Sequence, residues 1–236
     1  MKIEAIILAR GGSKGIPNKN IMDFCGIPLI SWTIKQCINS QLIDKITVSS
    51  DSKDILKVAK DMGVNCLKRP YEYSNDCATS ESAITHWLDQ MDNKPDYVVF
   101  PQVTSPLREK EDLDYAIKTL IHTDADSLFS ACKLDDCCIW DDTRSITYNH
   151  MVRGNRQNKK PLYLENGSIY IFKPNVCFKN NAGWDDISFS NEKNNRLKGN
   201  IVKYMMPFWK SYEIDTPDDI EICEYYMNKI ISKEKK

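Results

Sequence analysis

The alternation of short β-branched runs with helical segments is the feature that most narrows the fold of this chain. An apolar run at residues 3–8 is typical of a buried first strand, and runs at 45–50 and 97–100 are typical of later strands. Apolar residues between these runs recur at helical spacing, and the alternation continues through about the first 131 residues. Because crossovers between parallel strands are right-handed, this order predicts an α/β fold with a mainly parallel, doubly wound sheet.

The turn after the first predicted strand combines adjacent glycines with three cations. Residues 8–20 read Leu-Ala-Arg-Gly-Gly-Ser-Lys-Gly-Ile-Pro-Asn-Lys-Asn, so Arg10, Lys14 and Lys19 fall within ten residues. Glycine lets backbone N–H groups approach an anion closely. The pattern fits neither the Walker A loop nor the dinucleotide fingerprint. A solvated turn is the alternative for an isolated Gly-Gly pair, but the position after a first strand and the three cations favour a polyphosphate ligand.

Composition argues against several other classes of function. The 32 basic and 33 acidic residues give a net charge of −1, which offers no reason to expect a nucleic acid or an anionic membrane as partner. No apolar run approaches the ~18 residues of a membrane span, and Met1 leads directly into a strand pattern, so we expect a cytoplasmic protein. The nine cysteines form no Cys-x-x-Cys pair, which favours reduced thiols over a zinc site.

The opening loop resembles that of the N-acylneuraminate (sialic acid) cytidylyltransferases, a family that includes the CMP-legionaminic and CMP-pseudaminic acid synthetases. The residues that match the family's pattern are Arg10, Lys14, Gly15, Lys19 and Asn20. Further motifs follow in the family's order along nearly the whole chain. The resemblance implies a Rossmann-like fold of the nucleotide-diphospho-sugar transferase type with a small dimerisation arm.

The same resemblance divides the chain into three parts. Residues 1–131 correspond to the nucleotide-binding α/β part. The polar stretch 132–165 corresponds to an arm that packs on a second subunit and contributes to the sugar site. Residues 166–236 complete the α/β domain with a metal-binding segment and a C-terminal helix. A homodimer is therefore expected.

Two segments are assigned to the nucleotide by the resemblance. Beside the opening loop, Lys68-Arg69-Pro70 and residues 76–80 match the part of the family that recognises cytosine. Backbone groups near Ala78 and Ser80, with Arg69 reaching a carbonyl acceptor, would select the base by hydrogen bonding. Taken alone, this stretch is only a loop and a helix N-cap. The full set of expected nucleotide-binding residues is Arg10, Gly11, Gly12, Ser13, Lys14, Lys19, Asn20, Arg69, Ala78 and Ser80.

Residues 102–108, Gln-Val-Thr-Ser-Pro-Leu-Arg, follow a predicted strand and match a family motif in which the glutamine is aimed at the sugar. The family usually has proline where Val103 stands. An ion pair with Glu109 or Asp112 is one interpretation of Arg108. The sugar-binding residues that the resemblance implies are Gln102, Arg156, Asn166 and Tyr170. Because Leu164-Glu165 replaces the Arg-Pro found in many sialic acid enzymes, the identity of the acyl sugar stays open.

The segment Tyr-Glu-Ile-Asp-Thr-Pro-Asp-Asp at residues 212–219 resembles the family's metal-binding motif. Side chains two apart on an extended segment point the same way, so Glu213 and Asp215 offer carboxylates to one ion. Mg²⁺ (or Mn²⁺) is the cofactor expected there, held by carboxylates together with substrate phosphates. Glu213 stands where aspartate is usual, so Asp215 is the stronger candidate. Glu-x-Asp in isolation is more often a surface feature.

The resemblance implies a transfer activity. CMP passes from CTP to the anomeric hydroxyl of a 3-deoxy-nonulosonic acid, and pyrophosphate is released. CTP and an acidic nine-carbon sugar are then the partners. Arg10, Lys19 and Asp215 are the expected catalytic residues, with the general base left open. Two alternatives stay in view: a nucleotidyltransferase for another nucleotide or acidic sugar, such as 3-deoxy-manno-octulosonate, and a non-catalytic nucleotide-binding domain.

Overall fold

A computed structural model describes residues 1–134, 138–147, 149, 151–152, 155, 157, 160–178 and 194–234. Its main sheet has seven strands in the order β5-β4-β1-β6-β8-β7-β9. These strands are β1 (Ile3–Leu8), β4 (Lys45–Ser50), β5 (Asn65–Lys68), β6 (Tyr97–Pro101), β7 (Ser127–Leu134), β8 (Leu162–Phe172) and β9 (Ile201–Met205). A separate small hairpin pairs β2 (Asp23–Phe24) with β3 (Ile27–Pro28).

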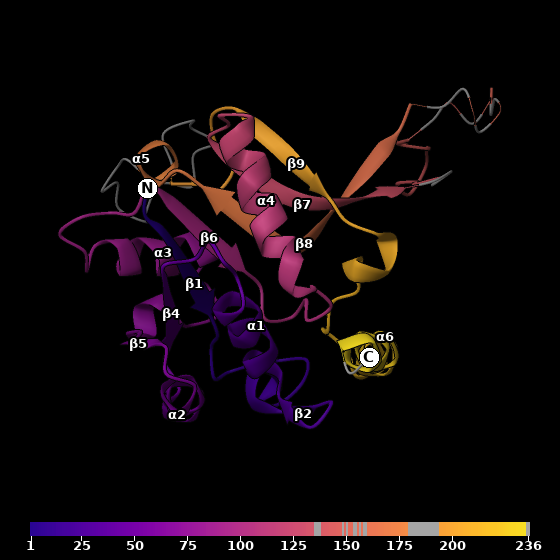
Figure 1. Cartoon of the computed structure of the whole chain (residues 1–236). Helices are drawn as coiled ribbons and strands as arrows, with labels where there is room; N and C mark the ends of the chain where they lie inside the picture. Colours follow the sequence, from indigo (N-terminus) through magenta and orange to yellow (C-terminus); the bar gives the residue numbers. More distant parts are fainter. Residues whose placement is uncertain are drawn as a thin grey trace.

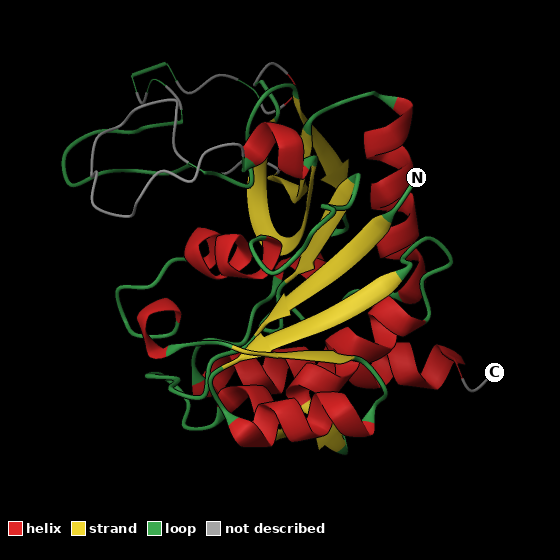
Figure 2. Ribbon diagram, turned by 90° about the vertical axis from the view of Figure 1, so that its left-hand side faces the viewer, coloured by secondary structure: helices red, strands yellow, loops and turns green. Residues whose placement is uncertain are grey.

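Helices cover both faces of the sheet, as Figures 1 and 2 show. The α-helices are α1 (Leu29–Ile38), α2 (Lys53–Asp61), α3 (Ser80–Leu88), α4 (Lys110–His122), α5 (Pro174–Cys177) and α6 (Pro217–Glu234). The short 3-10 helices are η1 (Lys19–Ile21), η2 (Tyr71–Tyr73) and η4 (Phe208–Ser211). Helices α1, α2, α4 and α6 pack on the face that contains Ala5 and Ile7, whereas α3 and α5 pack on the face that contains Ile6.

The expected mainly parallel α/β sheet is confirmed, with one antiparallel strand in its middle. Strand β1 pairs in parallel with β4 and β6, β4 with β5, and β7 with β9. Strand β8 runs antiparallel to both β6 and β7. Residues 135–161 connect it to β7, and the described part of that connection contains no α-helix. A parallel return usually runs through a helical crossover, so the antiparallel direction of β8 agrees with this connection.

Strand β8 is longer than the sequence pattern predicts. The run Gly-Ser-Ile-Tyr-Ile-Phe predicts a strand over residues 167–172, but pairing with β7 begins at Leu162, opposite Leu134. The side chains of Tyr163 and Leu164 are 44% and 42% exposed, so this first part of the strand has no buried face and leaves no alternating apolar signal. The ends of β7 and β8 extend beyond the rest of the sheet in Figure 1.

Two helix starts can be compared with their expected positions. Pro217 is the first residue of α6, and Asp218 and Asp219 occupy its first turn, as the sequence predicts. The preference of proline for the first helical position also predicts that α1 starts at Pro28. Pro28 is instead the N-cap of α1, because it pairs with Asp23 in the small hairpin. Among the described residues, none of the helices has the length and apolarity that crossing a lipid bilayer requires.

Candidate functional site

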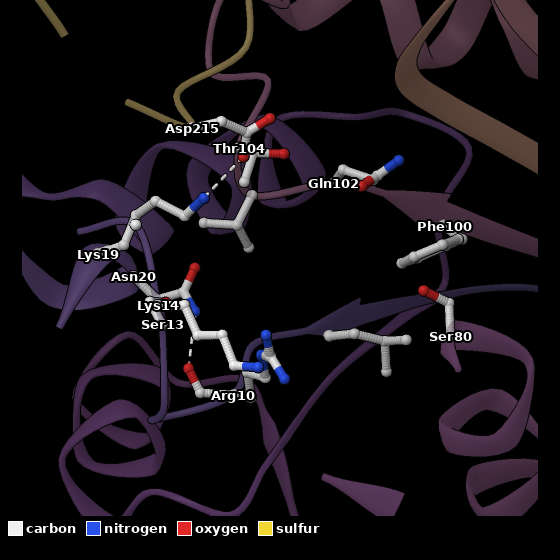
Figure 3. A pocket seen from close by; sticks show the side chains of 13 residues that line it. Arg10, Ser13, Lys14, Lys19, Asn20, Ser80, Phe100, Gln102, Thr104 and Asp215 are labelled. Atoms are coloured by element: carbon white, nitrogen blue, oxygen red, sulfur yellow. Dashed lines mark hydrogen bonds and ion pairs between the residues drawn. The ribbon is translucent and has the colours of Figure 1, made fainter. Parts of the chain in front are cut away.

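A cavity of about 320 Å³ opens where β1 and β6 end, the edge at which parallel sheets place their ligands. It gathers residues from the opening loop, from α3, from the segment after β6 and from the segment before α6. The predicted site residues on its wall are Arg10, Ser13, Lys14, Lys19, Asn20, Ser80, Gln102 and Asp215. Figure 3 shows these side chains around the cavity.

The contact between Lys19 and Asp215 joins two segments that lie far apart in the sequence. The Lys19 Nζ is 2.9 Å from the Asp215 Oδ1 and 2.9 Å from the carbonyl oxygen of Ile214. Gly15 allows this approach, because a Cβ there would lie 2.6 Å from the carbonyl oxygen of Asp215. The Lys19 side chain is 13% exposed and that of Asp215 is 66% exposed. The loop and the carboxylate segment therefore form one site, as the sequence analysis required.

Asp76 bridges the other two cations of the loop. Its Oδ1 is 3.1 Å from the Arg10 Nη1, and its Oδ2 is 2.9 Å from the Lys14 Nζ. The hydrogen bond from Lys14, with the charges of Lys14 and Arg10, lowers the pKa of the Asp76 carboxyl. Sequence reasoning did not single out Asp76, although it opens the stretch at residues 76–80. Its carboxylate lies where the two cations converge, which marks a position suited to an anion.

Other predicted loop residues contribute to the shape of the turn. The backbone N–H of Gly11 donates to the Asp51 Oδ1 at 2.9 Å, and the Asn20 Nδ2 donates to the carbonyl oxygen of Arg10 at 2.9 Å. Both bonds fix the loop on the end of the sheet, and Asn20 is 7% exposed. Gly12 is exposed, and a Cβ there would meet nothing within 4 Å. Gly12 therefore lies open to solvent, whereas the Gly11 amide already has an acceptor.

A second cavity of about 250 Å³ adjoins the first and shares Leu8, Arg10 and Ser80 with it. Arg69 and Ala78 line it, so the residues predicted to recognise the base lie together. Arg69 is 6% exposed, and its buried Nε has no hydrogen-bond partner among the residues that the structure describes. Burial lowers the pKa of this guanidinium. A buried cation with an unpaired donor favours a ligand that brings a hydrogen-bond acceptor.

Arg108 builds the frame behind Gln102. It is 1% exposed. Its guanidinium donates to the carbonyl oxygens of Ser168 at 2.8 Å and Gln102 at 2.9 Å, to the Thr33 Oγ1 at 3.0 Å and to the Gln36 Oε1 at 3.1 Å. Burial lowers the pKa of Arg108 to about 10. The residue thus ties α1, β8 and the segment after β6 together at the edge of the cavity.

The suggested pairing of Arg108 with Glu109 or Asp112 is wrong. Asp112 instead accepts from the backbone N–H of Glu109 at 2.7 Å, which caps α4. Both carboxylates bind Lys210, with Nζ–oxygen distances of 2.7 Å to Glu109 and 2.6 Å to Asp112. The helix begins after Arg108, so these acids turn toward η4 while the arginine turns into the core. Sequence proximity alone does not show this divergence.

The remaining predicted sugar residues lie beside the cavity or outside the described chain. Asn166 is 2% exposed; its side-chain oxygen accepts from the Ser130 hydroxyl, and its Nδ2 lies 3.5 Å from the Met206 sulfur. Tyr170 stacks on Phe100 with 5.9 Å between ring centroids and donates to Glu165. Burial raises the pKa of Tyr170. Phe100 lines the cavity, whereas Asn166 and Tyr170 are set behind its wall. Arg156 falls outside the described residues.

Glu213 lies deeper than Asp215. Its Oε2 accepts from the Thr104 Oγ1 at 3.4 Å, and its Oε1 is packed against Gly167, whose φ of +64° suits glycine. Burial, followed by the charge of Asp215, raises the pKa of the Glu213 carboxyl. The two carboxylates are therefore close enough to interact, and one of them faces the cavity.

Comparisons with known proteins show the family of the chain. A family model of cytidylyltransferases matches residues 4–231 of the chain. The chain belongs to the cytidylyltransferase family. The chain is 35% identical to N-acylneuraminate cytidylyltransferase A of Danio rerio over 182 residues, which cover 72% of the chain and 41% of that protein. It is 30% identical over 227 residues to N-acylneuraminate cytidylyltransferase of Streptococcus agalactiae serotype V, covering 93% and 52%.

The chain thus spans about half or less of the length of these curated relatives. Among solved structures, CMP:2-keto-3-deoxy-manno-octonic acid synthetase complexed with CTP superposes with a TM-score of 0.71 at 14% identity, covering 97% of this chain and 99% of that one. The 4-diphosphocytidyl-2C-methyl-D-erythritol synthase of Anaerococcus prevotii gives 0.67 at 18% identity, covering 96% of each chain. These likenesses confirm the fold of the nucleotide-diphospho-sugar transferase type.

Proposed function

We propose that this cytidylyltransferase transfers CMP from CTP to the anomeric hydroxyl of a 3-deoxy-nonulosonic, sialic acid-like sugar and releases pyrophosphate. The observation that carries the proposal is the contact between Lys19 and Asp215 in the cavity that also contains Arg10 and Lys14. A cluster of cations beside an exposed carboxylate suits a polyphosphate and a reacting hydroxyl. The relatives named N-acylneuraminate cytidylyltransferases support the choice of acceptor.

The triphosphate would bind across Arg10, Lys14 and Lys19. When it enters, its oxygens replace the Asp76 carboxylate between Arg10 and Lys14. These cations then stabilise the charge that develops on the leaving pyrophosphate as the bond between the α- and β-phosphates breaks. The Gly12 amide lies open and adds a backbone donor.

Cytosine would bind in the second cavity. Arg69 lines that cavity together with Ala78 and Ser80, and its buried Nε has no partner among the described residues. A buried donor without a partner rewards a base that carries a carbonyl acceptor and penalises one that lacks it. This arrangement supports selection of CTP by hydrogen bonding.

Gln102 and Phe100 would face the acceptor sugar at the other end of the first cavity. Arg108 fixes the Gln102 backbone, which presents the amide side chain to the cavity with little freedom. The anomeric oxygen attacks the α-phosphorus, and its proton must leave. Asp215, whose side chain is 66% exposed, is the carboxylate available to accept that proton.

Mg²⁺ or Mn²⁺ would be held by Asp215 with Glu213. The described residues contain no cluster of three or more protein ligands. Magnesium is often held by only one or two carboxylates together with substrate phosphates, so a pair of carboxylates beside a phosphate loop fits the ion. When bound, it would supply additional positive charge at the phosphates.

A homodimer is also proposed. Exposed apolar side chains gather on the described part of the arm and on the start of β8, including Ile139, Trp140, Ile146, Tyr163 and Leu164. Apolar groups in this number are typical of a surface that a second subunit covers. Light scattering during size-exclusion chromatography measures the mass of the assembly.

A cytoplasmic location is proposed as well. The eight described cysteines are free, which supports it.

Release of pyrophosphate tests the activity. The purified protein is incubated with Mg²⁺, one of CTP, UTP, GTP or ATP, and one of N-acetylneuraminic, legionaminic, pseudaminic or 3-deoxy-manno-octulosonic acid. Turnover with CTP and a nine-carbon acid supports the proposal. A preference for the eight-carbon 3-deoxy-manno-octulosonic acid would instead support a nucleotidyltransferase for that sugar. Binding of CTP without turnover on any acceptor supports a non-catalytic domain.

A further inference from the structure

We propose that Arg196 recognises the carboxylate of the acceptor sugar, an inference that rests on the proposed function above. Arg196 lies between α5 and β9 in the sequence and belongs to none of the motifs that predicted the site. The fold places it against the acceptor end of the cavity. It would determine that the enzyme takes an acidic sugar rather than a neutral one.

The cavity has two chemically different ends. Figure 3 shows Lys19 and Asp215 on one side, with Lys14 and Arg10 below them, and Phe100 and Ser80 together at the opposite side. The phosphate-binding cations all belong to the first side. An acidic acceptor therefore requires a positive charge at the side of Phe100, because a carboxylate transferred from water into a protein wall is costly without one.

Arg196 lies directly against that second side. Its guanidinium carbon is 4.4 Å from the centre of the Tyr170 ring and 5.6 Å from the centre of the Phe100 ring. Its Nε is 3.5 Å from the Oε1 of Glu81, the residue after Ser80. Phe100 and Ser80 both line the cavity. Arg196 is thus held by an aromatic surface on one side and by the start of α3 on the other.

The Arg196 guanidinium has hydrogen-bond donors left for a ligand. The long contact with Glu81 uses only Nε, and the hydrogen bonds among the described residues give its two terminal nitrogens no acceptor. The side chain is 24% exposed, so these donors are partly desolvated but reachable. A planar guanidinium binds a carboxylate through two parallel hydrogen bonds. Contact with two aromatic rings restricts the guanidinium before the sugar arrives.

The described cations elsewhere on the site do not serve this end. Arg10, Lys14, Lys19 and Arg69 line the phosphate and base sides of the two cavities. The acids near the acceptor end, Glu165 on Tyr170 and Glu213 on Thr104, would repel a carboxylate. Arg196 is therefore the described residue whose charge and position match an anionic acceptor.

The test compares an acidic acceptor with its neutral ester. Steady-state kinetics are measured for the wild type, Arg196→Gln and Arg196→Lys with the nine-carbon acid that the acceptor screen identifies and with its methyl ester, at saturating CTP and Mg²⁺. Lys118→Gln is the matched control, because Lys118 also lies over an aromatic ring, Tyr115 at 5.8 Å, but on α4 outside both cavities.

We expect Arg196→Gln to lower kcat/KM for the acid by about 30-fold or more, mainly through KM, and to change kcat/KM for the ester by less than about threefold. Arg196→Lys, which keeps the charge but not the planar fork, should lose about tenfold for the acid. The KM for CTP should stay within twofold in each variant, and Lys118→Gln should match the wild type.

Equal losses of kcat/KM for the acid and the ester would show that Arg196 only holds the α3 region in place. Wild-type kinetics of Arg196→Gln would show that Arg196 does not recognise the acceptor. Either result overturns the inference while the proposed function stands. If Arg196→Gln does not fold, Arg196→Lys decides by the same acid-to-ester ratio. A wild type that turns over no acceptor refutes the proposed function and this inference with it.

Discussion

Two arginines, each identified from a motif at the end of a strand, have opposite roles in the folded molecule. Arg10 follows β1, has a side chain 37% exposed, and pairs with a carboxylate that is itself exposed. Arg108 follows β6, is 1% exposed, and donates only to neutral oxygens. The Arg10 guanidinium is available to a ligand, whereas the Arg108 guanidinium already donates to the buried oxygens that hold Gln102 in place.

The difference shows how the two walls of the cavity are built. The phosphate side consists of loop cations whose partners can be exchanged for those of a ligand. The acceptor side rests on buried hydrogen bonds that leave Gln102 little freedom. Substitutions on the first wall should therefore change binding and catalysis, and substitutions behind the second should change stability first.

The largest expected effect is on stability. Arg108→Ala would leave several buried acceptors without a donor, so the free energy of unfolding should fall by about 3–5 kcal/mol. Urea denaturation measures it, with Arg10→Ala as the matched control that should unfold within about 0.5 kcal/mol of the wild type. Equal stability of the two variants would contradict the contrast drawn between the two arginines.

Lys19→Ala should have the next largest effect, on catalysis. Removal of the cation that contacts Asp215 and faces the phosphates should lower kcat/KM by about 10²-fold or more while the protein stays folded. Pyrophosphate release at varied CTP measures the loss, and circular dichroism verifies the fold. Wild-type turnover by this variant would exclude Lys19 from the mechanism.

A smaller effect is expected at the carboxylate between Arg10 and Lys14. Asp76→Asn removes an anion that competes with the triphosphate, so the Kd for CTP should decrease by about three- to tenfold. Isothermal titration calorimetry measures it. Asp61→Asn is the control, because Asp61 forms a similar exposed pair with Lys57 at 2.7 Å on α2. Weaker CTP binding by Asp76→Asn would show that Asp76 positions the cations for the nucleotide instead.

The smallest expected effect is a pH dependence at Glu213. Its pKa is raised in the folded protein, so the folded state holds this proton more tightly, and stability falls as pH rises from the unfolded pKa through the folded one. Glu213→Gln removes this loss. The Tm of the variant relative to the wild type, measured without divalent ions, should therefore be higher at pH 7.5 than at pH 4, by up to about 2–4 °C. A difference that shrinks with rising pH would contradict this.

Local patterns predicted most of the framework. Helical spacing and β-branched runs identified the main strands and the α-helices of the first 131 residues but not the small hairpin, and Pro217 with two following acids identified the start of α6. The start of β8 was missed because residues 163–165 are exposed and carry no alternating apolar pattern. The direction of β8 depends on its antiparallel pairing with β6 and β7, which periodicity does not report.

The candidate site shows the same division. Residue types and loop chemistry singled out Arg10, Lys14, Lys19 and Asp215, and the fold brings them to one cavity. The sequence did not show which residues these side chains contact in the folded protein. Asp76 and Arg196 lie outside the predicted sets because their importance comes from contacts with residues distant in the chain.

The sequence by itself determined the alternation of elements and the chemical types at the strand ends, because local sterics, hydrophobic periodicity and charge depend on neighbours along the chain. Only the tertiary structure decided which charged groups remain available to a ligand. Burial and hydrogen bonding separate Arg108 from Arg10, and close packing at Gly15 brings Asp215 to Lys19. Those outcomes depend on which distant segments meet, and that is a property of the folded molecule.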